Sequence, residues 1–378
     1  MKIGILTQPL YYNYGGIIQN WALQQVLRRM GHQPEMIFLT AHSKPNARLI
    51  AMRCLSFAKC VIKKYLLNRS DVYLHSVLNP RYNPSAPQYV DNEFIKCIRK
   101  TKLLDVSVDL AKFVDKRRYD AFIVGSDQVW REEYSPNILS FFLDFLPADD
   151  TRKRIAYAAS FGKEHDYISS EKMPECLRLL SLFDSVSVRE TEGIGIIQHD
   201  FGREQVEKVL DPTLLLSSAD YERLIKPNDH HRTPYIASYI LDSNNDKSTI
   251  IAQIATEKDL PANKINIEVR SGAMATMSQW LANFADADYV VTDSFHGCVF
   301  SIIFGKPFIA IANAERGLGR FVSLLEEFGL THRLINKLDD FTSRRDELIA
   351  DIDYTPVHRR HNALREHSFT WLKNALKK

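Results

Sequence analysis

A histidine and an aspartate lie between two apolar runs, where their side chains could take part in chemistry. The stretch reads YVVTDSFHGCVFSIIFGKPFIAI, from Tyr289 to Ile311. Asp293 follows the first run and His296 precedes the second. Histidine is the usual general acid near neutral pH, because its ordinary pKa is about 6.5. The pattern therefore predicts a buried strand, a polar crossing that carries His296, and a buried helix.

His296 also has a purely structural interpretation. A lone histidine beside apolar residues is most often a buried side chain whose ring nitrogens are hydrogen-bonded. The position at a strand-to-helix crossing, beside Asp293, favours a functional role instead. The N-terminus of the following helix would attract an anion through its N–H groups. Asp293 or Ser294 could alternatively cap that helix.

Expected strands and helices alternate along the chain. The opening KIGILT is short, apolar and β-branched, which is typical of a buried strand, and a helical pattern follows it and ends at Gly31. Further strands are expected in the segments YDAFIVGS, RIAYAASF, DSVSVRE, EKVLDPTLLL, PYIASYIL, NKINIEV, ADYVVTDS and GKPFIAIA. The alternation predicts an α/β protein with parallel, doubly wound sheets and flanking helices.

The alternation breaks near residues 217–229 and then restarts. We therefore expect two Rossmann-like domains, over residues 1–216 and 217–354. Residues 355–378 have the pattern of one basic helix, which we expect to pack back on the N-terminal domain.

Polar or small residues follow most of the expected strands. The clusters are Asn13, Tyr14, Gly15 and Gly16; Ser126, Asp127 and Gln128; Ser160–Gly162; Arg189 and Glu190; Asp211–Thr213; and Asp293–Gly297. Ligands of open α/β sheets bind outside the carboxyl ends of the strands, so these clusters predict one cleft shared by both domains. Two plainer interpretations remain open: Asp127 could be a helix cap, and Gly15 with Gly16 could only permit a tight turn.

Composition narrows the class of protein. The net charge of +3 over 378 residues is too small to indicate a nucleic-acid partner. The five cysteines are scattered without CxxC spacing, which fits reduced thiols in a cytoplasmic protein. The N-terminus has the pattern of a strand and not of a signal peptide, and no apolar run reaches the ~18 residues of a membrane-spanning helix.

The sequence predicts no bound metal and no cofactor. It contains neither GxGxxG nor a P-loop lysine, so neither a dinucleotide nor ATP is indicated. Asp286 and Asp288 form a DxD, but this motif precedes a strand, where aspartates are common in loops. The histidine pairs His230–His231 and His358–His361 lack a third ligand.

Five motifs in order resemble the polysaccharide pyruvyl transferase family. They are YYNYGGIIQNWALQ, YDAFIVGSDQVW, SVSVRE, VLDPTLLL and the stretch around His296. The resemblance implies a GT-B-like fold in which two Rossmann-like domains face a cleft. It also implies transfer of the carboxyethylidene group of phosphoenolpyruvate, a co-substrate, to two hydroxyls of a sugar, which gives a pyruvate ketal and phosphate.

The resemblance also implies roles for particular residues. His296 and Gly297 match the family's histidine-glycine of the donor site, and Arg189 matches a donor-binding arginine. Asp293 is expected to orient His296. Many members have arginine where this chain has Ser294, so the missing positive charge is expected from Arg270, Arg316 or Arg320. The residues expected on the acceptor side are Asn13, Tyr14, Gly15, Gly16, Ser126, Asp127 and Gln128.

A basic segment, Ala47–Ser70, has a helical pattern with its cations on one side. It could pack its apolar face on a sheet, or it could lie on an anionic membrane surface. The membrane alternative fits a cytoplasmic enzyme with a lipid-linked oligosaccharide acceptor. Two other functions stay open: a GT-B nucleotide-sugar glycosyltransferase, and a non-catalytic phosphate- or sugar-binding protein.

Overall fold

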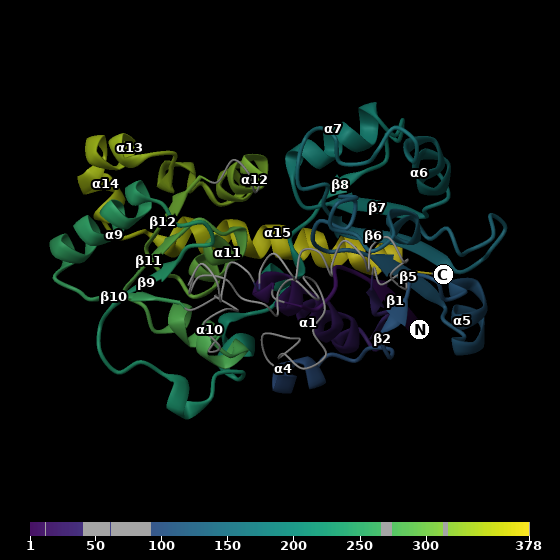
Figure 1. The fold of residues 1–378 in the computed structure, drawn as a ribbon, viewed down its shortest axis with the longest axis horizontal. Helices are drawn as coiled ribbons and strands as arrows, with labels where there is room; N and C mark the ends of the chain where they lie inside the picture. Colours follow the sequence, from purple (N-terminus) through teal and green to yellow (C-terminus); the bar gives the residue numbers. More distant parts are fainter. Residues whose placement is uncertain (12, 41–60, 62–91, 266–273, 313–316, 378) are drawn as a thin grey trace.

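The structure is a computed structural model of the 378-residue chain. It describes residues 1–11, 13–40, 61, 92–265, 274–312 and 317–377. Within these ranges, two parallel β-sheets lie in separate halves of the molecule, and one long helix runs between the halves (Figure 1). The predicted α/β class with parallel sheets and flanking helices is confirmed.

The N-terminal half is built on a six-stranded sheet with the order β2-β1-β5-β6-β7-β8. Its strands are β1 (Lys2–Leu6), β2 (Gln33–Met36), β5 (Ala121–Val124), β6 (Lys153–Ala159), β7 (Ser185–Val188) and β8 (Glu207–Lys208). The helices of this half are α1 (Tyr14–Arg29), α4 (Asn92–Lys96), α5 (Leu110–Arg117), α6 (Met173–Leu180) and α7 (Thr191–His199). A separate parallel pair joins β3 (Leu39–Thr40) to β4 (Leu104–Asp105).

The C-terminal half is built on a five-stranded sheet with the order β10-β9-β11-β12-β13. Its strands are β9 (Ile236–Tyr239), β10 (Ala262–Lys264), β11 (Tyr289–Thr292), β12 (Phe308–Ile311) and β13 (Leu334–Ile335). The helices are α8 (Ser218–Glu222), α9 (Asn245–Lys258), α10 (Met277–Ala285), α11 (Phe295–Ile303), α12 (Leu318–Phe328), α13 (Leu338–Ser343), α14 (Arg345–Ile349) and α15 (Tyr354–Ala375). None of the described helices is long and apolar enough to cross a membrane.

One predicted strand differs from the structure. In EKVLDPTLLL only Glu207–Lys208 is extended, and Pro212–Leu215 forms a 3-10 helix. Pro212 has no N–H to contribute to a strand ladder, and the Asp211 side chain accepts a hydrogen bond from the Thr213 N–H instead. The strand therefore ends early and brings the carboxylate of Asp211 to the carboxyl edge of the sheet.

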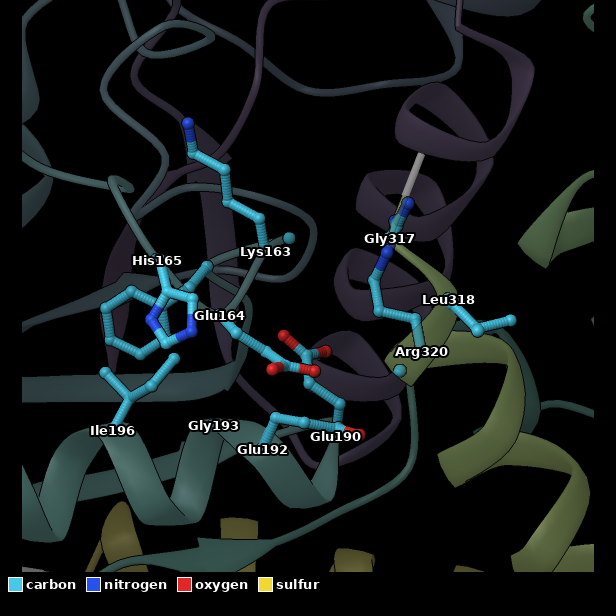
Figure 2. A pocket seen from close by; sticks show the side chains of 13 residues that line it. Lys163, Glu164, His165, Glu190, Glu192, Gly193, Ile196, Gly317, Leu318 and Arg320 are labelled. Atoms are coloured by element: carbon cyan, nitrogen blue, oxygen red, sulfur yellow. The ribbon is translucent and has the colours of Figure 1, made fainter. Parts of the chain in front are cut away.

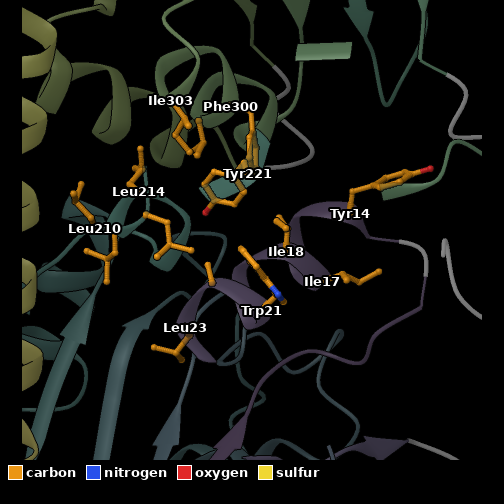
Figure 3. Close-up of a cluster of buried hydrophobic side chains, with 14 of the residues drawn as sticks. Tyr14, Ile17, Ile18, Trp21, Leu23, Leu210, Leu214, Tyr221, Phe300 and Ile303 are labelled. Carbon is orange, nitrogen blue, oxygen red and sulfur yellow. The ribbon is translucent and has the colours of Figure 1, made fainter. Parts of the chain in front are cut away.

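The two halves share a continuous apolar core. The Trp21 ring of α1 lies 5.9 Å from the Tyr221 ring, which lies 5.0 Å from the Phe300 ring of α11 (Figure 3). The buried Tyr221 hydroxyl donates to the carbonyl of Thr213 at 2.7 Å. Aromatic contacts of this kind add to the energy of burial, so α1 and α11 are held close at the junction of the halves.

Helix α15 links the C-terminal half to the N-terminal half (Figure 1). Nε2 of His361 lies 2.7 Å from the carbonyl oxygen of Leu214, and the buried N–H of Leu210 donates to Oγ of Ser368 at 3.0 Å. Near the end of the helix, the Trp371 ring lies 6.0 Å from the Tyr157 ring of β6. These contacts of α15 fix the segment of chain that carries Asp211.

Candidate functional site

A buried ion-pair network forms where β5, β7 and β8 reach the carboxyl edge of the first sheet. Its centre is Arg189, which directly follows β7 and whose side chain is 1% exposed. Nη1 of Arg189 donates to Asp211 at 2.7 Å, and Nη2 donates to Asp127 at 3.0 Å. The guanidinium also lies 4.7 Å from the centre of the Phe295 ring, at the start of α11. Arg189 therefore holds both halves together at this edge.

His296 lies beside this network in the first turn of α11. Its Nε2 is 3.9 Å from Oδ2 of Asp211, which is too long for a hydrogen bond, and this buried nitrogen has no hydrogen-bond partner. Burial lowers the pKa of His296 to about 4; the nearby Asp211 carboxylate opposes this shift and Arg189 adds to it. The imidazole is consequently neutral at pH 7, with one ring nitrogen available to a ligand or a proton.

Gly15 determines where the imidazole lies. A Cβ on Gly15, in the first turn of α1, would lie 2.0 Å from Nδ1 of His296. Only glycine permits this approach of a helix backbone to the ring. Gly15 was predicted on the acceptor side, and that role stays a prediction. In the structure, its lack of a side chain leaves room for the His296 ring.

The predicted partnership of His296 with Asp293 stays a prediction. The Asp293 carboxylate accepts hydrogen bonds from the N–H groups of Leu241 and Asp242, at 2.6 and 3.1 Å, and from Nζ of Lys247 at 2.7 Å. These contacts tie the end of β11 to the start of α9. A carboxylate from the other half of the molecule, that of Asp211, lies 3.9 Å from Nε2 of the imidazole.

The carboxylate of Asp211 has several hydrogen-bond partners. Its carboxylate accepts from Arg189, from the hydroxyl of Ser126 at 3.1 Å and from the hydroxyl of Thr213 at 2.7 Å. Burial alone would raise the pKa of Asp211, but the charge of a protonated His296, the Arg189 guanidinium and the Thr213 hydrogen bonds lower it. Asp211 thus stays ionised and can stabilise a positive charge on His296.

Several residues predicted on the acceptor side belong to the same network. Asp127 is an ion-pair partner of Arg189, and its predicted contact with an acceptor stays a prediction. Its second oxygen accepts from Nδ2 of Asn13 at 3.3 Å. A Cβ on Gly16 would lie 3.1 Å from the same Asp127 carboxylate. Ser126 is completely buried. These contacts place Asn13 and Gly16, at the start of α1, against the Asp127 carboxylate.

Tyr14 and Gln128 lie at its borders. The Tyr14 ring stacks on Trp280 of the other half with 5.4 Å between ring centres, and its hydroxyl donates to the carbonyl of Ala275. Oε1 of Gln128 accepts from Nη1 of Arg131 at 3.3 Å. Tyr14 therefore acts as an interdomain contact in the structure, and its contact with an acceptor stays a prediction.

The residues predicted to bind the donor are found in different surroundings. Arg189 gives both terminal nitrogens to carboxylates, so its donor contact stays a prediction. Ser294 is buried at the N-cap position of α11 without capping the helix through its side chain. Gly297 permits close packing, since a Cβ there would lie 2.1 Å from Oγ1 of Thr292. Arg270 and Arg316 lie outside the described residues.

Arg320 is the third arginine considered as a replacement, and it lies at an interdomain cleft. The residue is buried, and its guanidinium lies 5.8 Å from the centre of the Phe295 ring that also contacts Arg189. Burial and the charge of Arg189 lower the pKa of Arg320 to about 10. Both causes disfavour the charged form and the carboxylates of Glu190 and Asp127 favour it, so a further anion bound beside Arg320 would be stabilised.

The cleft has a volume of about 360 Å³ and lies between α7 and the start of α12 (Figure 2). It is lined by Phe161, Gly162, Lys163, Glu164, His165, Glu190, Glu192, Gly193, Ile196, Gly317, Leu318, Gly319 and Arg320. The sequence predicted a cleft between the halves and placed Arg320 near it. It did not single out Glu192 or Glu164, because glutamates at the start of a helix or in a loop are usually solvated.

No group of three His, Cys, Asp or Glu side chains with the arrangement of a metal site occurs among the described residues. Asp286, from the DxD sequence, instead lies 3.0 Å from Nδ1 of His230. The third position of that motif, Asp288, accepts from the N–H of Tyr235. Both aspartates therefore have protein partners near the N-terminal ends of β9 and β11.

We expect Gly15→Ala to lower the thermal midpoint and to abolish most activity, because the new methyl group must displace the His296 ring or move α1. Overpacking of this kind typically costs ~1–3 kcal/mol. Gly195→Ala is the matched control: its Cβ would meet nothing closer than 4.0 Å, and helix interiors gain ~0.5–1 kcal/mol from this change. Equal thermal midpoints for Gly15→Ala and wild type would show that the ring is not seated this way.

A second prediction concerns pH. Below pH 6.5 an unfolded chain protonates His296, whereas the folded chain does so only near pH 4, so this group costs stability as the pH falls between these values. His296→Gln removes that cost and should flatten the fall of the thermal midpoint between pH 6.5 and 4. The exposed His199→Gln should follow wild type. Parallel curves for His296→Gln and wild type would contradict a lowered pKa.

Comparison with known proteins gives the family and the fold. A family model described as polysaccharide pyruvyl transferase matches residues 13–315. The comparison with curated proteins found no match. Among solved structures, UDP-GlcNAc 2-epimerase from Neisseria meningitidis bound to UDP-GlcNAc is similar, with a TM-score of 0.51, 10% identity, and coverage of 100% of this chain and 99% of that chain.

The UDP-GlcNAc 2-epimerase of Methanocaldococcus jannaschii gives a TM-score of 0.48 with 12% identity, covering 97% of this chain and 100% of that chain. The likeness to the Neisseria enzyme confirms the predicted GT-B-like arrangement of two Rossmann-like halves. Since the family model spans most of the chain and includes Arg189 and His296, the chain belongs to the polysaccharide pyruvyl transferase family.

Proposed function

We propose that this transferase moves the carboxyethylidene group of phosphoenolpyruvate onto two hydroxyls of a sugar, forming a pyruvate ketal and releasing phosphate. The observation that carries the proposal is the unpartnered, buried Nε2 of His296, 3.9 Å from Asp211 in a site that also holds two buried arginines. A neutral imidazole beside an ionised aspartate is suited to taking up a proton and delivering it.

The reaction needs such a group because it begins with a proton transfer to carbon. The methylene carbon of phosphoenolpyruvate gains a proton, positive charge develops at C2, and a sugar hydroxyl adds there. Phosphate then leaves, and the second hydroxyl closes the ketal. General acid catalysis typically contributes ~10²–10⁴-fold in rate, and His296 is the group that we assign to it.

His296 must be charged before it can act, although burial keeps it neutral in the free protein. Phosphoenolpyruvate carries three negative charges when fully ionised. Its arrival would raise the pKa of His296, because nearby negative charge favours the imidazolium. Donor binding and proton uptake are therefore one event in this proposal, and Asp211 stabilises the charge from the opposite side.

Arg320 is the group that we assign to the donor's phosphate or carboxylate. It lines the cleft, and burial beside Arg189 lowers its pKa to about 10, a shift that a bound anion would oppose. The planar guanidinium suits both anions, since it can donate two parallel hydrogen bonds to either. It would supply the positive charge that Ser294 lacks.

The acceptor that we propose is a sugar of a lipid-linked polysaccharide precursor, used at the cytoplasmic face of the membrane. The basic segment Ala47–Ser70, which motivates the membrane contact, lies outside the described residues apart from Val61. A nucleotide-sugar glycosyltransferase would share the fold, so the two functions must be separated by their leaving groups.

We expect the protein to bind phosphoenolpyruvate in calorimetry, and to release phosphate when a sugar acceptor is added. Arg320→Gln should weaken this binding about 10- to 100-fold, the equivalent of the ~1.5–3 kcal/mol of a hydrogen bond to a charged group. Arg178→Gln, an exposed arginine on α6, is the control and should bind normally. Release of UDP from UDP-sugars without any phosphate release from phosphoenolpyruvate would replace the proposal with the glycosyltransferase.

A further inference from the structure

Two glutamates of the cleft have carboxylate oxygens that lack a hydrogen-bond partner. Glu190 is 4% exposed, and its buried Oε2 accepts no hydrogen bond, although it lies 3.5 Å from Nε of Arg189 in an ion pair. The buried Oε2 of Glu192 has none either. Both residues line the cleft together with Arg320 (Figure 2). An unsatisfied buried acceptor typically costs ~1–3 kcal/mol, so a ligand that donates hydrogen bonds would be stabilised here.

The chain places these two carboxylates side by side for local reasons. Glu190 has an extended backbone conformation at the N-cap position of α7, directly after β7, and its side chain makes no capping hydrogen bond to the helix. Glu192 follows in the first turn of the helix. The negative charge of Glu192 and, above all, burial raise the pKa of Glu190, against the effects of Arg189 and a hydrogen bond from Ser160. Glu190 is thus a better proton acceptor than a solvated glutamate.

The opposite wall of the cleft approaches Glu192 closely at a glycine. A Cβ on Gly319, in the first turn of α12, would lie 2.6 Å from Oε1 of Glu192. The halves are fixed in this position nearby, where the N–H of Thr191 donates to Oγ of Ser323 at 3.0 Å. The distance between α7 and α12 is therefore set by direct contacts and by the lack of a side chain at Gly319.

Arg320 offers positive charge in this cleft, but at the two glutamates the lining indicates a neutral ligand that donates hydrogen bonds. Glu190 and Glu192 would repel an anion, and Glu164 adds a third carboxylate at the exposed rim. Lys163, which also lines the cleft, has a partner of its own, because its Nζ lies 3.5 Å from Glu133. Among the groups of a carbohydrate, neutral hydroxyls can donate hydrogen bonds to two adjacent carboxylates, whereas the carboxylate of a uronic acid would be repelled.

We propose that Glu190 and Glu192 form the acceptor subsite: each accepts a hydrogen bond from one hydroxyl of a neutral sugar diol, and Glu190 removes the proton of the second hydroxyl to react. The assignment rests on the proposed function for its chemical step. It deepens that function by naming the base and by limiting the acceptor to an uncharged sugar residue at this subsite.

The proton balance of the ketal supports the assignment. Two C–O bonds form at C2 and one C–H bond forms at the methylene carbon, while the C=C π bond and the C–O bond to phosphate break and both sugar hydroxyls lose a proton. One of these protons replaces the one that the methylene carbon receives from His296. The other passes through Glu190 to the departing phosphate. No oxidant, reductant or further reactant is needed.

The subsite can be tested without knowing the natural acceptor. The probes are the methyl glycosides of glucose, galactose and mannose, each paired with the methyl glycoside of its own uronic acid, and binding is followed by saturation-transfer NMR. Wild type should bind at least one neutral glycoside about tenfold better than its uronic acid. Glu192→Gln should reduce that preference about tenfold, whereas the exposed Glu171→Gln should keep it.

The chemical step has its own readout. With phosphoenolpyruvate and the best-bound glycoside, Glu190→Gln should release phosphate ~10²-fold or more slowly, while its Kd for phosphoenolpyruvate stays within about threefold of wild type. A selective loss of turnover with donor binding retained is not expected from mere unfolding.

The outcomes separate the two proposals. If wild type binds no neutral glycoside, or if Glu192→Gln binds all of them as wild type does, the subsite is wrong. If Glu190→Gln retains wild-type turnover, its role as the base is wrong. If wild type binds glycosides through these glutamates but neither binds phosphoenolpyruvate nor releases phosphate, the subsite stands and the proposed function is wrong.

Discussion

The buried guanidinium of Arg189 is the interaction on which the rest of the site depends. It joins Asp127 to Asp211 and contacts Phe295, and so connects three strand ends of one half to α11 of the other. Transferring a charge from water to the protein interior costs free energy. Deleting one partner of a buried ion pair typically costs ~3–5 kcal/mol of stability. The network therefore fixes a single geometry for the groups around it.

That geometry determines the charge state of the site. Asp211 shares its carboxylate among Arg189, Ser126 and Thr213, and no hydrogen bond reaches from it to His296. The imidazole is close enough to be stabilised once it is protonated, but burial keeps it neutral beforehand. A site of this kind responds to an incoming anion by taking up a proton, which is what protonation of an enol phosphate requires.

The sequence was sufficient for the fold class, because buried parallel strands are apolar and the segments between them have helical spacing. Polar residues after those strands also located the edge that carries the site, including His296, Arg189 and Asp127. The partner of His296 could not be predicted in the same way. Asp211 is distant from His296 in the sequence, yet its carboxylate lies 3.9 Å from the imidazole, since α11 packs against the other half.

The other features that the sequence did not predict also depend on contacts between residues that are distant in the chain. The role of Gly15 depends on how closely α1 approaches a ring that is 281 positions away in the chain. In the sequence, Glu192 looks like any glutamate in the first turn of a helix. Its enclosure in the cleft depends on the start of α12, which the sequence does not place beside it. Pro212 did carry a readable signal, because a proline there argues against a continuous strand and for the turn that presents Asp211.

Proton uptake on donor binding tests the central claim most directly. Calorimetric titration of phosphoenolpyruvate in two buffers with different ionisation enthalpies, at the same pH near 7, gives the number of protons exchanged per donor bound. The account predicts that wild type takes up about one proton more than His296→Gln does. Donor binding with identical proton exchange in wild type and His296→Gln would show that His296 does not become charged, and would contradict the account.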